Sequence, residues 1–422
     1  MANFQASNRE TSDLEPHRGA TPPCPHFGPC GGCQLQHLTY AAQLDLKASR
    51  LRALLEAANL DLPELQFHPS PPLGYRNRIR LTLGVVGGQL HAGYLTAAPD
   101  ASNLEPRTSI PSFLPIRECP IAAPILWRAT EALLALLNQR ATEWLEQPPF
   151  TVDQLELFTT SDESLLQIML FVRTSAKSLP AKFTPALASL CESLRSEIPA
   201  LSGAGIALIP TRSARSRRDE QPRPGPTWGA PGLNYAVPSL QLTTDGSQLA
   251  PSFWVPRGAF FQINRFLIPD LLSLVTPNRS GALAWDLYAG VGLFTKPLAP
   301  HFARIVAVEI AEPAFTALTS AKLPNRQAFK DTTLDFLRAA VVDRDRPDLV
   351  VLDPPRTGAG PETCALLARI AAPTLIYVSC SPETLPADLK ILTASGYAIS
   401  ELHLLDLFPQ TTHIETVAIL TR

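Results

Sequence analysis

The feature that most constrains the fold is an alternation of short apolar segments and helical stretches from about residue 265 to the C-terminus. The apolar segments are ALAWDLYAG, RIVAVEI, PDLVVLDPP and PTLIYVSC. Strands that alternate with helices in this way form a parallel sheet covered by helices. The last two segments, YAISELHLLDLF and IETVAILTR, are separated only by a turn, so we expect them to pair antiparallel. The region is therefore predicted to be a doubly wound α/β domain ending in an antiparallel strand pair.

The chain before this region predicts a smaller α+β domain. Its pattern indicates helices over 38–60, 122–146 and 183–198, hairpins over 75–95 and 155–172, and a strand over 205–210. The first hairpin has Gly87-Gly88 at its turn, which favours a tight connection. Residues 212–232 are rich in Arg, Pro and Gly and are predicted to be a loop.

The charge balance limits the possible partners. A formal net charge of -2 excludes a uniformly basic nucleic-acid binder, but local clusters such as Arg76, Arg78 and Arg80 can still dock a polyanion. No apolar run approaches the ~18 residues of a membrane-spanning helix. The polar N-terminus has no apolar segment typical of a signal peptide. We therefore expect a cytoplasmic protein without a membrane segment.

A cofactor site is predicted at the ends of the parallel strands, where ligands bind in open α/β sheets. Gly290 and Gly292 follow the first strand and allow the backbone to approach a ligand, although two such glycines alone are a weak signal. Glu309 ends the next strand, where an acid accepts ribose hydroxyls or simply caps the strand end. Because Lys296-Pro297 stands where a dinucleotide fingerprint needs a glycine, the pattern favours S-adenosylmethionine. The antiparallel last strands also indicate a class I methyltransferase.

A nucleophile and a base are predicted at the same edge. Cys380 closes the strand LIYVSC, and Glu415 lies between the last two strands. A thiolate that adds to carbon 6 of uracil makes carbon 5 nucleophilic, and a carboxylate can then remove the carbon-5 proton. Alone, Cys380 is equally well explained as an inert buried cysteine. In Asp353-Pro-Pro-Arg356, arginine replaces the aromatic residue of amino-methylating enzymes, which argues against methylation of an exocyclic amine.

The seven cysteines include a tight group in CPHFGPCGGCQLQH, and a further cysteine occurs in RECPI. An odd number of cysteines without a signal peptide argues against a disulfide framework and favours metal binding or catalysis. The spacing of the group is compatible with zinc, with His26 or His37 as additional ligands, and equally with an iron–sulfur cluster.

Several of these runs, taken in order, resemble the RNA uracil-5-methyltransferases, and most closely the iron–sulfur branch that acts on 23S ribosomal RNA. The resemblance extends over nearly the whole chain from Cys24. It rests on CPHFGPCGGCQLQH, YRNR, GAFFQIN, DLYAGVGLF, LDPPRTGAG, YVSCSPETLPADL and FPQTTHIETV.

The resemblance implies a methyl transfer from S-adenosylmethionine to carbon 5 of a uridine, with Cys380 as nucleophile and Glu415 as general base. It implies a [4Fe–4S] cluster, RNA as the partner (ribosomal or transfer RNA) and a monomer. The cluster ligands would be Cys24, Cys30, Cys33 and Cys119. Residues implied to bind the methyl donor or hold the uracil are Gln262, Tyr288, Gly290, Gly292, Glu309, Asp331 and Asp353.

The resemblance also implies a division of the chain. Residues 1–23 would be a flexible tail, 24–33 and 68–258 a central iron–sulfur and RNA-binding domain, and 34–67 and 259–422 the Rossmann-like methyltransferase domain. Two departures stand out: Ala289 replaces a frequent cysteine, and only 23 residues precede the cysteine group, too few for the small β-barrel common in ribosomal-RNA members.

Three other functions fit parts of the pattern. A transfer-RNA uracil-5-methyltransferase would use the same chemistry. Methylation of cytosine carbon 5 also uses a cysteine but usually has proline beside it, whereas serines flank Cys380. An inactive iron–sulfur RNA-binding protein is the alternative from another class, and it leaves Cys380, Glu415, Gln262 and Asp353 without a reason to occur together.

Overall fold

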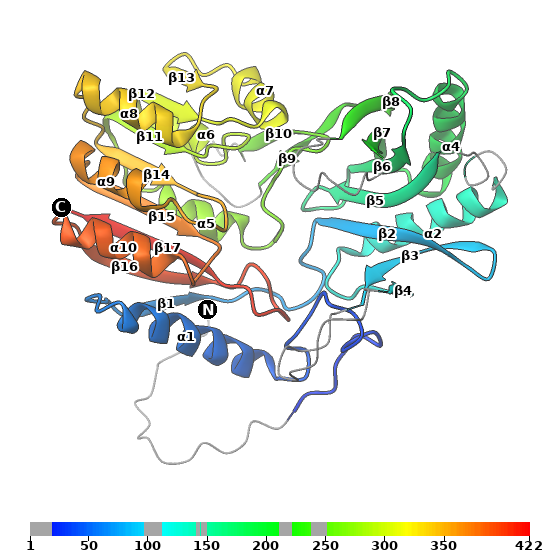
Figure 1. Ribbon diagram of the computed structural model, residues 1–422, viewed down its shortest axis with the longest axis horizontal. Coiled ribbons are helices and arrows are strands. Elements are labelled where there is room, and N and C mark those ends of the chain that lie inside the picture. The colour runs from blue at the N-terminus through cyan, green and yellow to red at the C-terminus, as the bar shows by residue number, and fades with distance from the viewer. Residues whose placement is uncertain (1–18, 97–111, 141–143, 145–149, 211–221, 238–250) are drawn as a thin grey trace.

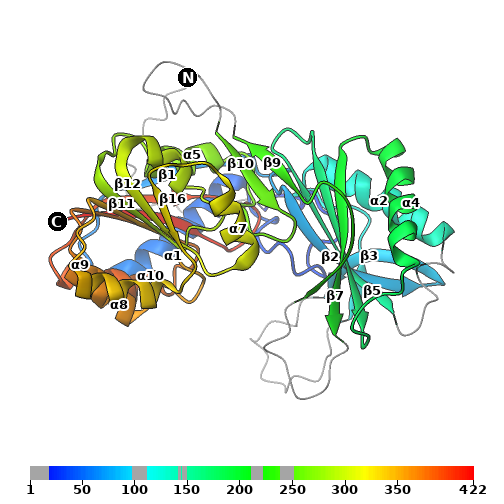
Figure 2. The ribbon, with the colours of Figure 1, turned by 90° about the horizontal axis from the view of Figure 1, so that it is seen from above.

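The computed structural model describes residues 19–96, 112–140, 144, 150–210, 222–237 and 251–422. The molecule has two lobes, each built on one β-sheet, and a two-stranded hairpin lies between them (Figures 1 and 2). The C-terminus lies at the outer side of the larger lobe.

The larger lobe contains an eight-stranded sheet in the order β1-β16-β17-β15-β14-β11-β12-β13. All neighbouring pairs are parallel except the two made by β17, which runs antiparallel between β15 and β16. The prediction of a parallel sheet with an antiparallel final pair is therefore confirmed. The strands are β1 (Leu65–His68), β11 (Gly281–Leu287), β12 (Phe302–Val308), β13 (Arg326–Phe329), β14 (Leu349–Leu352), β15 (Thr374–Ser379), β16 (Ala398–Leu405) and β17 (Glu415–Thr421).

Helices cover both faces of this sheet, so both faces are apolar. One face is buried by α1, α8, α9 and α10, and the other by α5, α6 and α7 together with the hairpin. The helices are α1 (Tyr40–Ala57), α5 (Ile268–Val275), α6 (Thr295–Leu298), η1 (Ala299–His301), α7 (Glu312–Ser320), α8 (Thr333–Asp343), α9 (Pro361–Ile370) and α10 (Leu385–Ala394).

The smaller lobe contains a seven-stranded sheet in the order β4-β3-β2-β5-β6-β7-β8, with α2 and α4 packed against its core. Only β6 and β7 pair parallel, and α4 provides the crossover that a parallel pair requires. The elements are β2 (Arg78–Val86), β3 (Gln89–Leu95), β4 (Phe113–Pro115), α2 (Pro124–Gln139), β5 (Thr151–Thr159), β6 (Leu166–Thr174), α4 (Phe183–Glu197), β7 (Leu201–Pro210) and β8 (Arg223–Gly229).

The prediction that residues 212–232 form a loop is wrong for the second half of this segment. Residues 211–221 lie outside the described part of the chain, but β8 pairs antiparallel with β7 and forms the edge of the sheet. An edge strand has a neighbour on one side only, so it tolerates Pro224 and Pro226. The next strand, β9 (Gly232–Ala236), pairs with β10 (Ser252–Pro256) in the hairpin between the lobes. The predicted helix 122–146 is also shorter, since α2 ends at Gln139.

The segment after the cysteine group belongs to the larger sheet. Thr39 caps the N-terminus of α1 by accepting a hydrogen bond from the Ala42 N–H, and β1 pairs in parallel with β16. The buried Lys47 ammonium contacts the Asp406 carboxylate at 2.6 Å. Removing either partner of a buried ion pair of this kind strongly destabilises a protein, because the remaining charge is buried without compensation.

Candidate active site

The two predicted catalytic side chains are brought together by the pairing of β15 and β17. Ser379, the last residue of β15, is opposite Thr416. Because β17 runs antiparallel, Cys380 comes opposite Glu415 one step further along. Glu415 is 2% exposed, whereas Cys380 is half-buried at the mouth of the site. The Cys380 side chain is therefore partly accessible, whereas the Glu415 side chain is buried.

Two acidic groups and an amide line this part of the rim. Asp353 follows β14, the neighbour of β15, and Gln262 follows the hairpin strand β10. The Gln262 Nε2 donates to Asp353 Oδ2 at a distance of 3.5 Å. Burial raises the pKa of Glu415 well above its ordinary value, and the charge of Asp353 raises it further. A carboxyl group with a raised pKa is suited to accept and release a proton near neutral pH.

The thiol of Cys380 is protonated in the free protein. Burial raises its pKa to about 11, with further contributions from the charges of Glu415 and Asp353. The Arg356 guanidinium lowers the pKa of both Cys380 and Glu415. Sequence reasoning used Arg356 only to argue against amine methylation and missed this electrostatic role, although its position directly after Asp353-Pro-Pro is a usable signal.

The predicted cofactor loop follows β11 at the same edge of the sheet. The Glu309 carboxylate accepts hydrogen bonds from the Gly290 N–H at 2.8 Å and the Ala311 N–H at 2.6 Å. These bonds tie the end of β12 to the loop after β11. Gly290 has a φ of 57°, and a side chain there would meet no atom within 4 Å, so open space lies above its backbone. Tyr288 has a φ of 62°, and such a conformation in a bulky residue often marks a functional loop.

Asp331 lies apart from the nucleophile, beyond the end of β13, where its carboxylate is exposed and accepts a hydrogen bond from the Thr332 N–H at 2.7 Å. The strand order places β13 two strands beyond β11, on the side away from Cys380. The predicted residues therefore form an extended row along the sheet edge rather than one cluster.

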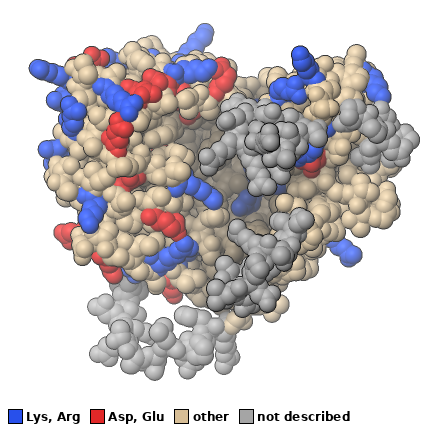
Figure 3. Space-filling model, viewed as in Figure 1, with Lys and Arg blue, Asp and Glu red and all other residues tan. Residues whose placement is uncertain are grey.

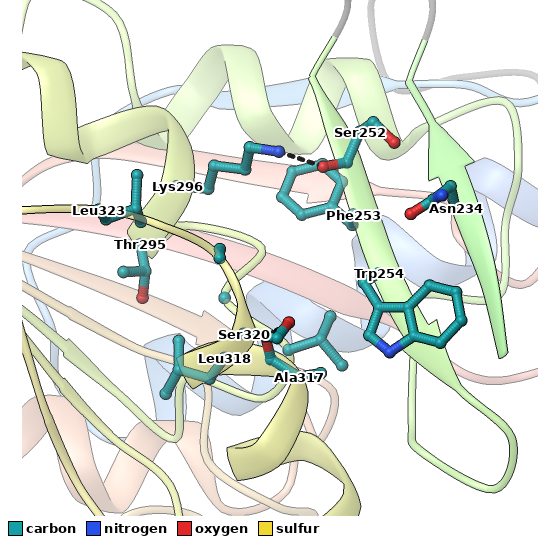
Figure 4. A pocket seen from close by; sticks show the side chains of 13 residues that line it. Asn234, Ser252, Phe253, Trp254, Thr295, Lys296, Ala317, Leu318, Ser320 and Leu323 are labelled. Carbon is teal, nitrogen blue, oxygen red and sulfur yellow. Dashed lines mark hydrogen bonds between the residues drawn. The ribbon is translucent and has the colours of Figure 1, made fainter. Parts of the chain in front are cut away.

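Gly292 faces a different space. With a φ of 91°, it packs so closely that an added Cβ would lie 3.0 Å from Leu318 Cδ1. It lines a cavity of about 310 Å³ between the β9–β10 hairpin and helices α6 and α7 (Figure 4). In this cavity the Lys296 ammonium donates to the Ser252 carbonyl and so ties the hairpin to α6. Cys380, Glu415 and Asp353 are not part of its lining.

The four predicted cluster ligands converge on a separate cavity of about 80 Å³, which is lined by Cys24, Cys30, Cys33 and Cys119. Among the described residues, no group of three or more His, Cys, Asp or Glu side chains is placed so that it could hold a metal ion as it stands. Burial raises the pKa of Cys119 to about 12, and the charge of Cys33 raises it further while that of Arg76 opposes it.

Arg76 is the basic residue at this cavity that sequence reasoning assigned to the protein surface. It lines the cavity with the cysteines, and its Nε is buried without a hydrogen-bond partner. In the described part of the chain it makes no ion pair with a carboxylate. Of the other arginines in that run, Arg78 lies 3.6 Å from Glu156, and Arg80 is exposed with its guanidinium over the Phe171 ring.

Basic side chains also lie at the hollow between the two lobes (Figure 3). Among the described residues, no helix is both long and apolar enough to cross a membrane.

Comparisons with known proteins place this geometry in a family. A model of the tRNA (uracil-5-)-methyltransferase family matches residues 326–422, which include Cys380 and Glu415. The 23S rRNA (uracil(1939)-C(5))-methyltransferase RlmD of Pseudomonas entomophila is 30% identical over 407 residues, covering 94% of this chain and 79% of that protein. The chain belongs to the RNA uracil-5-methyltransferase family. It is an S-adenosylmethionine-dependent RNA methyltransferase, which confirms the predicted family, reaction and methyl donor.

Other relatives extend the comparison. An uncharacterized RNA methyltransferase of Thermotoga maritima is 28% identical, covering 95% of this chain and 84% of that protein. The solved structure of a Pyrococcus abyssi tRNA (uracil-54, C5)-methyltransferase, in complex with S-adenosyl-L-homocysteine, has a TM-score of 0.64 at 22% identity. It covers 93% of this chain, and this likeness shows that the mixed α/β fold is that of a methyltransferase.

Proposed function

We propose that the enzyme methylates carbon 5 of a uridine through a covalent bond between Cys380 and carbon 6 of the base. The observation that supports this is the placement of Cys380 opposite Glu415 across two paired strands, with Asp353 beside them. An inactive RNA-binding protein would not require a partly exposed thiol opposite a buried carboxyl group in paired strands.

In the proposed sequence the Cys380 thiolate adds to carbon 6, which makes carbon 5 an enolate-like nucleophile. Carbon 5 then attacks the methyl group of S-adenosylmethionine, so that the bond between the methyl carbon and the sulfonium sulfur breaks and S-adenosylhomocysteine leaves. Glu415 then removes the carbon-5 proton, and the electron pair of that bond restores the 5,6 double bond while the Cys380 thiolate leaves. Because the pKa of Cys380 is about 11, the thiolate is a minor species, and Arg356 increases its population.

The cofactor residues are proposed from the same row. Glu309, fixed by the Gly290 and Ala311 N–H groups, would hold the ribose, and the open space over Gly290 would admit the methionine part. Asp331 would contact the adenine. Gln262, bonded to Asp353, would contact the uracil or the donor. Tyr288 and Gly292 are also proposed to contact the methyl donor or the uracil. At Gly292, the close packing against Leu318 is a second reason for a glycine.

We further propose that Cys24, Cys30, Cys33 and Cys119 hold a [4Fe–4S] cluster. The donor set fits because four cysteines line one cavity, and Arg76 beside them has no carboxylate partner among the described residues. A buried cation is costly unless an anion faces it, and thiolates bound to a metal would provide that charge. Zinc with His26 is less well supported, because the His26 Nε2 already accepts a hydrogen bond from the Arg117 N–H.

The RNA substrate is proposed to be 23S ribosomal RNA, as in the relatives named RlmD. Transfer RNA is the alternative, which the name of the matching family model favours. We also propose the domain boundaries given above, with 24–33 and 68–258 as the RNA-gripping part. Methylating transcripts of both RNAs with labelled S-adenosylmethionine and mapping 5-methyluridine by mass spectrometry decides between them.

The experiment that tests the chemistry uses Glu415→Gln, which keeps the shape of the side chain but cannot accept the proton. We expect methyl transfer to proceed and thiol elimination to stall, so that a methylated RNA–protein adduct survives denaturing electrophoresis. The same variant in a Cys380→Ala background should give no adduct. A folded Glu415→Gln protein that never forms the adduct, or an adduct that persists without Cys380, would show that the two roles are wrong.

A further inference from the structure

The segment that leads into Glu415, residues 406–413, forms turns and bends, yet its backbone carbonyl groups are held from outside the segment. Each of five consecutive carbonyls accepts a hydrogen bond from a distant donor. The pairs are Asp406 and Leu407 with Asn264 Nδ2, Phe408 with Lys47 Nζ, Pro409 with Tyr75 Oη, and Gln410 with the N–H groups of Gln34 and Leu35. Buried backbone carbonyls need hydrogen-bond partners, and because these partners come from distant parts of the chain, they fix the position of the segment.

Gln410 is the centre of this arrangement. It is 6% exposed and has a φ of 68°, a left-handed conformation that is unfavourable for a residue with a side chain. A reciprocal amide pair with Gln43 holds it there: the Gln410 N–H donates to Gln43 Oε1, and Gln43 Nε2 donates to Gln410 Oε1, both at 2.9 Å. A strained backbone persists only where its surroundings fix it, and here the Gln43 side chain of α1 contributes two of the hydrogen bonds that do so.

The same residue is bound to the segment that carries the cysteines. Gln34 and Leu35 directly follow Cys33, and their N–H groups both donate to the Gln410 carbonyl at 3.0 Å. Gln410 precedes Glu415 by five residues in the chain. The end of the cysteine group, the start of α1 and the approach to the catalytic carboxyl group therefore meet at one buried glutamine.

We infer that Gln43 and Gln410 are positioning residues for the general base: they hold residues 406–413 so that the Glu415 carboxylate reaches the carbon-5 proton of the methylated uracil. This inference rests on the proposed function of Glu415. Methyl transfer does not use Glu415, whereas the following proton removal does, and a displacement of about 1 Å can slow such a step by ~10²-fold. Loss of the hydrogen bonds between Gln43 and Gln410 should therefore slow proton removal and thiol release, and leave methyl transfer unchanged.

The test is Gln43→Met, which keeps the length of the side chain but removes both hydrogen bonds to Gln410, together with the bond from Gln43 Nε2 to the Leu38 carbonyl. In single-turnover reactions with labelled S-adenosylmethionine, we expect methyl transfer into the adduct within about threefold of the parent and release of methylated RNA at least about tenfold slower. Gln410→Gly is the second variant, because glycine accepts the positive φ while losing the Oε1 contact, and it should show a smaller delay. Gln89→Met, the same change at an exposed residue of β3, is the matched control and should behave like the parent.

The outcomes separate the inference from the proposed function. Glu415→Gln is measured beside these variants, and if it releases product as fast as the parent, the proposed base and the inference both fail. If Glu415→Gln stalls while Gln43→Met and Gln410→Gly release product normally, only the positioning inference is overturned. It is equally overturned if both variants slow methyl transfer and release to the same extent, since that indicates general loosening of the fold.

Discussion

The molecule places cysteines in two electrostatic environments of opposite sign. Burial raises the pKa of Cys380, the charges of Glu415 and Asp353 raise it further, and the charge of Arg356 opposes them. In the four-cysteine cavity burial raises the pKa of Cys119 to about 12, and the charge of Arg76, which has no carboxylate partner in the described residues, opposes that rise. The first environment keeps a thiol neutral until a substrate arrives. The second can accept permanently ionised sulfur, as a metal site requires.

The largest expected effect comes from removing a ligand of the proposed iron–sulfur cluster. Protein purified without air should be brown and contain about four irons per chain, as a cluster on four thiolates requires. Cys33→Ser should lose the iron and its visible absorption, whereas Cys191→Ala, in the core of the smaller lobe, should keep both. Iron analysis and absorption spectra check this, and stoichiometric zinc without iron would contradict the assignment.

The second prediction compares a change to methionine at two arginines, Arg76 beside the four cysteines and Arg356 beside Cys380. Arg76→Met should weaken iron retention against a chelator and leave the pH profile of the reaction unchanged. Arg356→Met should keep the iron but raise the pKa of Cys380, and a rise of ~1 in that pKa would slow formation of the covalent complex at about pH 7.5 by about tenfold. The measurement is the rate of trapping on saturating 5-fluorouridine RNA with S-adenosylmethionine, from about pH 6.5 to about pH 9, because proton removal by Glu415 is not required for trapping.

The rate should rise with pH in the parent and in Arg356→Met, since pH values in this range lie below the Cys380 pKa of about 11. The profile of Arg356→Met should lie at higher pH, and Arg356→Lys should restore it because the charge remains. A profile that does not move would show that Arg356 acts on RNA binding alone.

The sequence predicted that Cys380, Asp353 and Glu415 lie at one edge of the sheet, because local rules fix where these residues fall. Cys380 and Asp353 follow apolar strands, and the carboxyl ends of parallel strands meet at one edge. Glu415 joins them because the last two strands can only pair antiparallel. The large sheet was predictable for the same reason, although the parallel strand β1 at its far edge has no local signal.

What the sequence did not predict depends on contacts between distant segments. Gln43 and Gln410 are 367 residues apart, and nothing in either local pattern indicates the amide pair. Arg76 belongs to an alternating run that indicates a surface cluster, and only the packing of Cys119 and Cys33 around it places it at the cavity. The β8 strand was missed because its prolines indicate a loop unless the strand is known to be an edge.

The smallest predicted effect concerns the stability cost of the catalytic environment. The pKa of Glu415 is raised in the folded protein, so the folded state binds its proton more tightly than the unfolded chain does. The stability from this group is therefore present at low pH and is lost as pH rises from the ordinary glutamate value towards the raised one. Glu415→Gln removes this loss and should raise the unfolding temperature at about pH 8 by roughly 1 °C for each ~1 kcal/mol, since an unfolding entropy of ~2.1 cal/mol/K per residue amounts to about 0.9 kcal/mol/K for 422 residues. At about pH 5 the difference should shrink, and the exposed Glu56→Gln on α1 should show none at either pH. The contrary outcome is an unfolding temperature of Glu415→Gln that falls equally at both pH values. The Glu415 carboxylate would then stabilise the fold as an ordinary structural acid does, and its surroundings would not favour the protonated form.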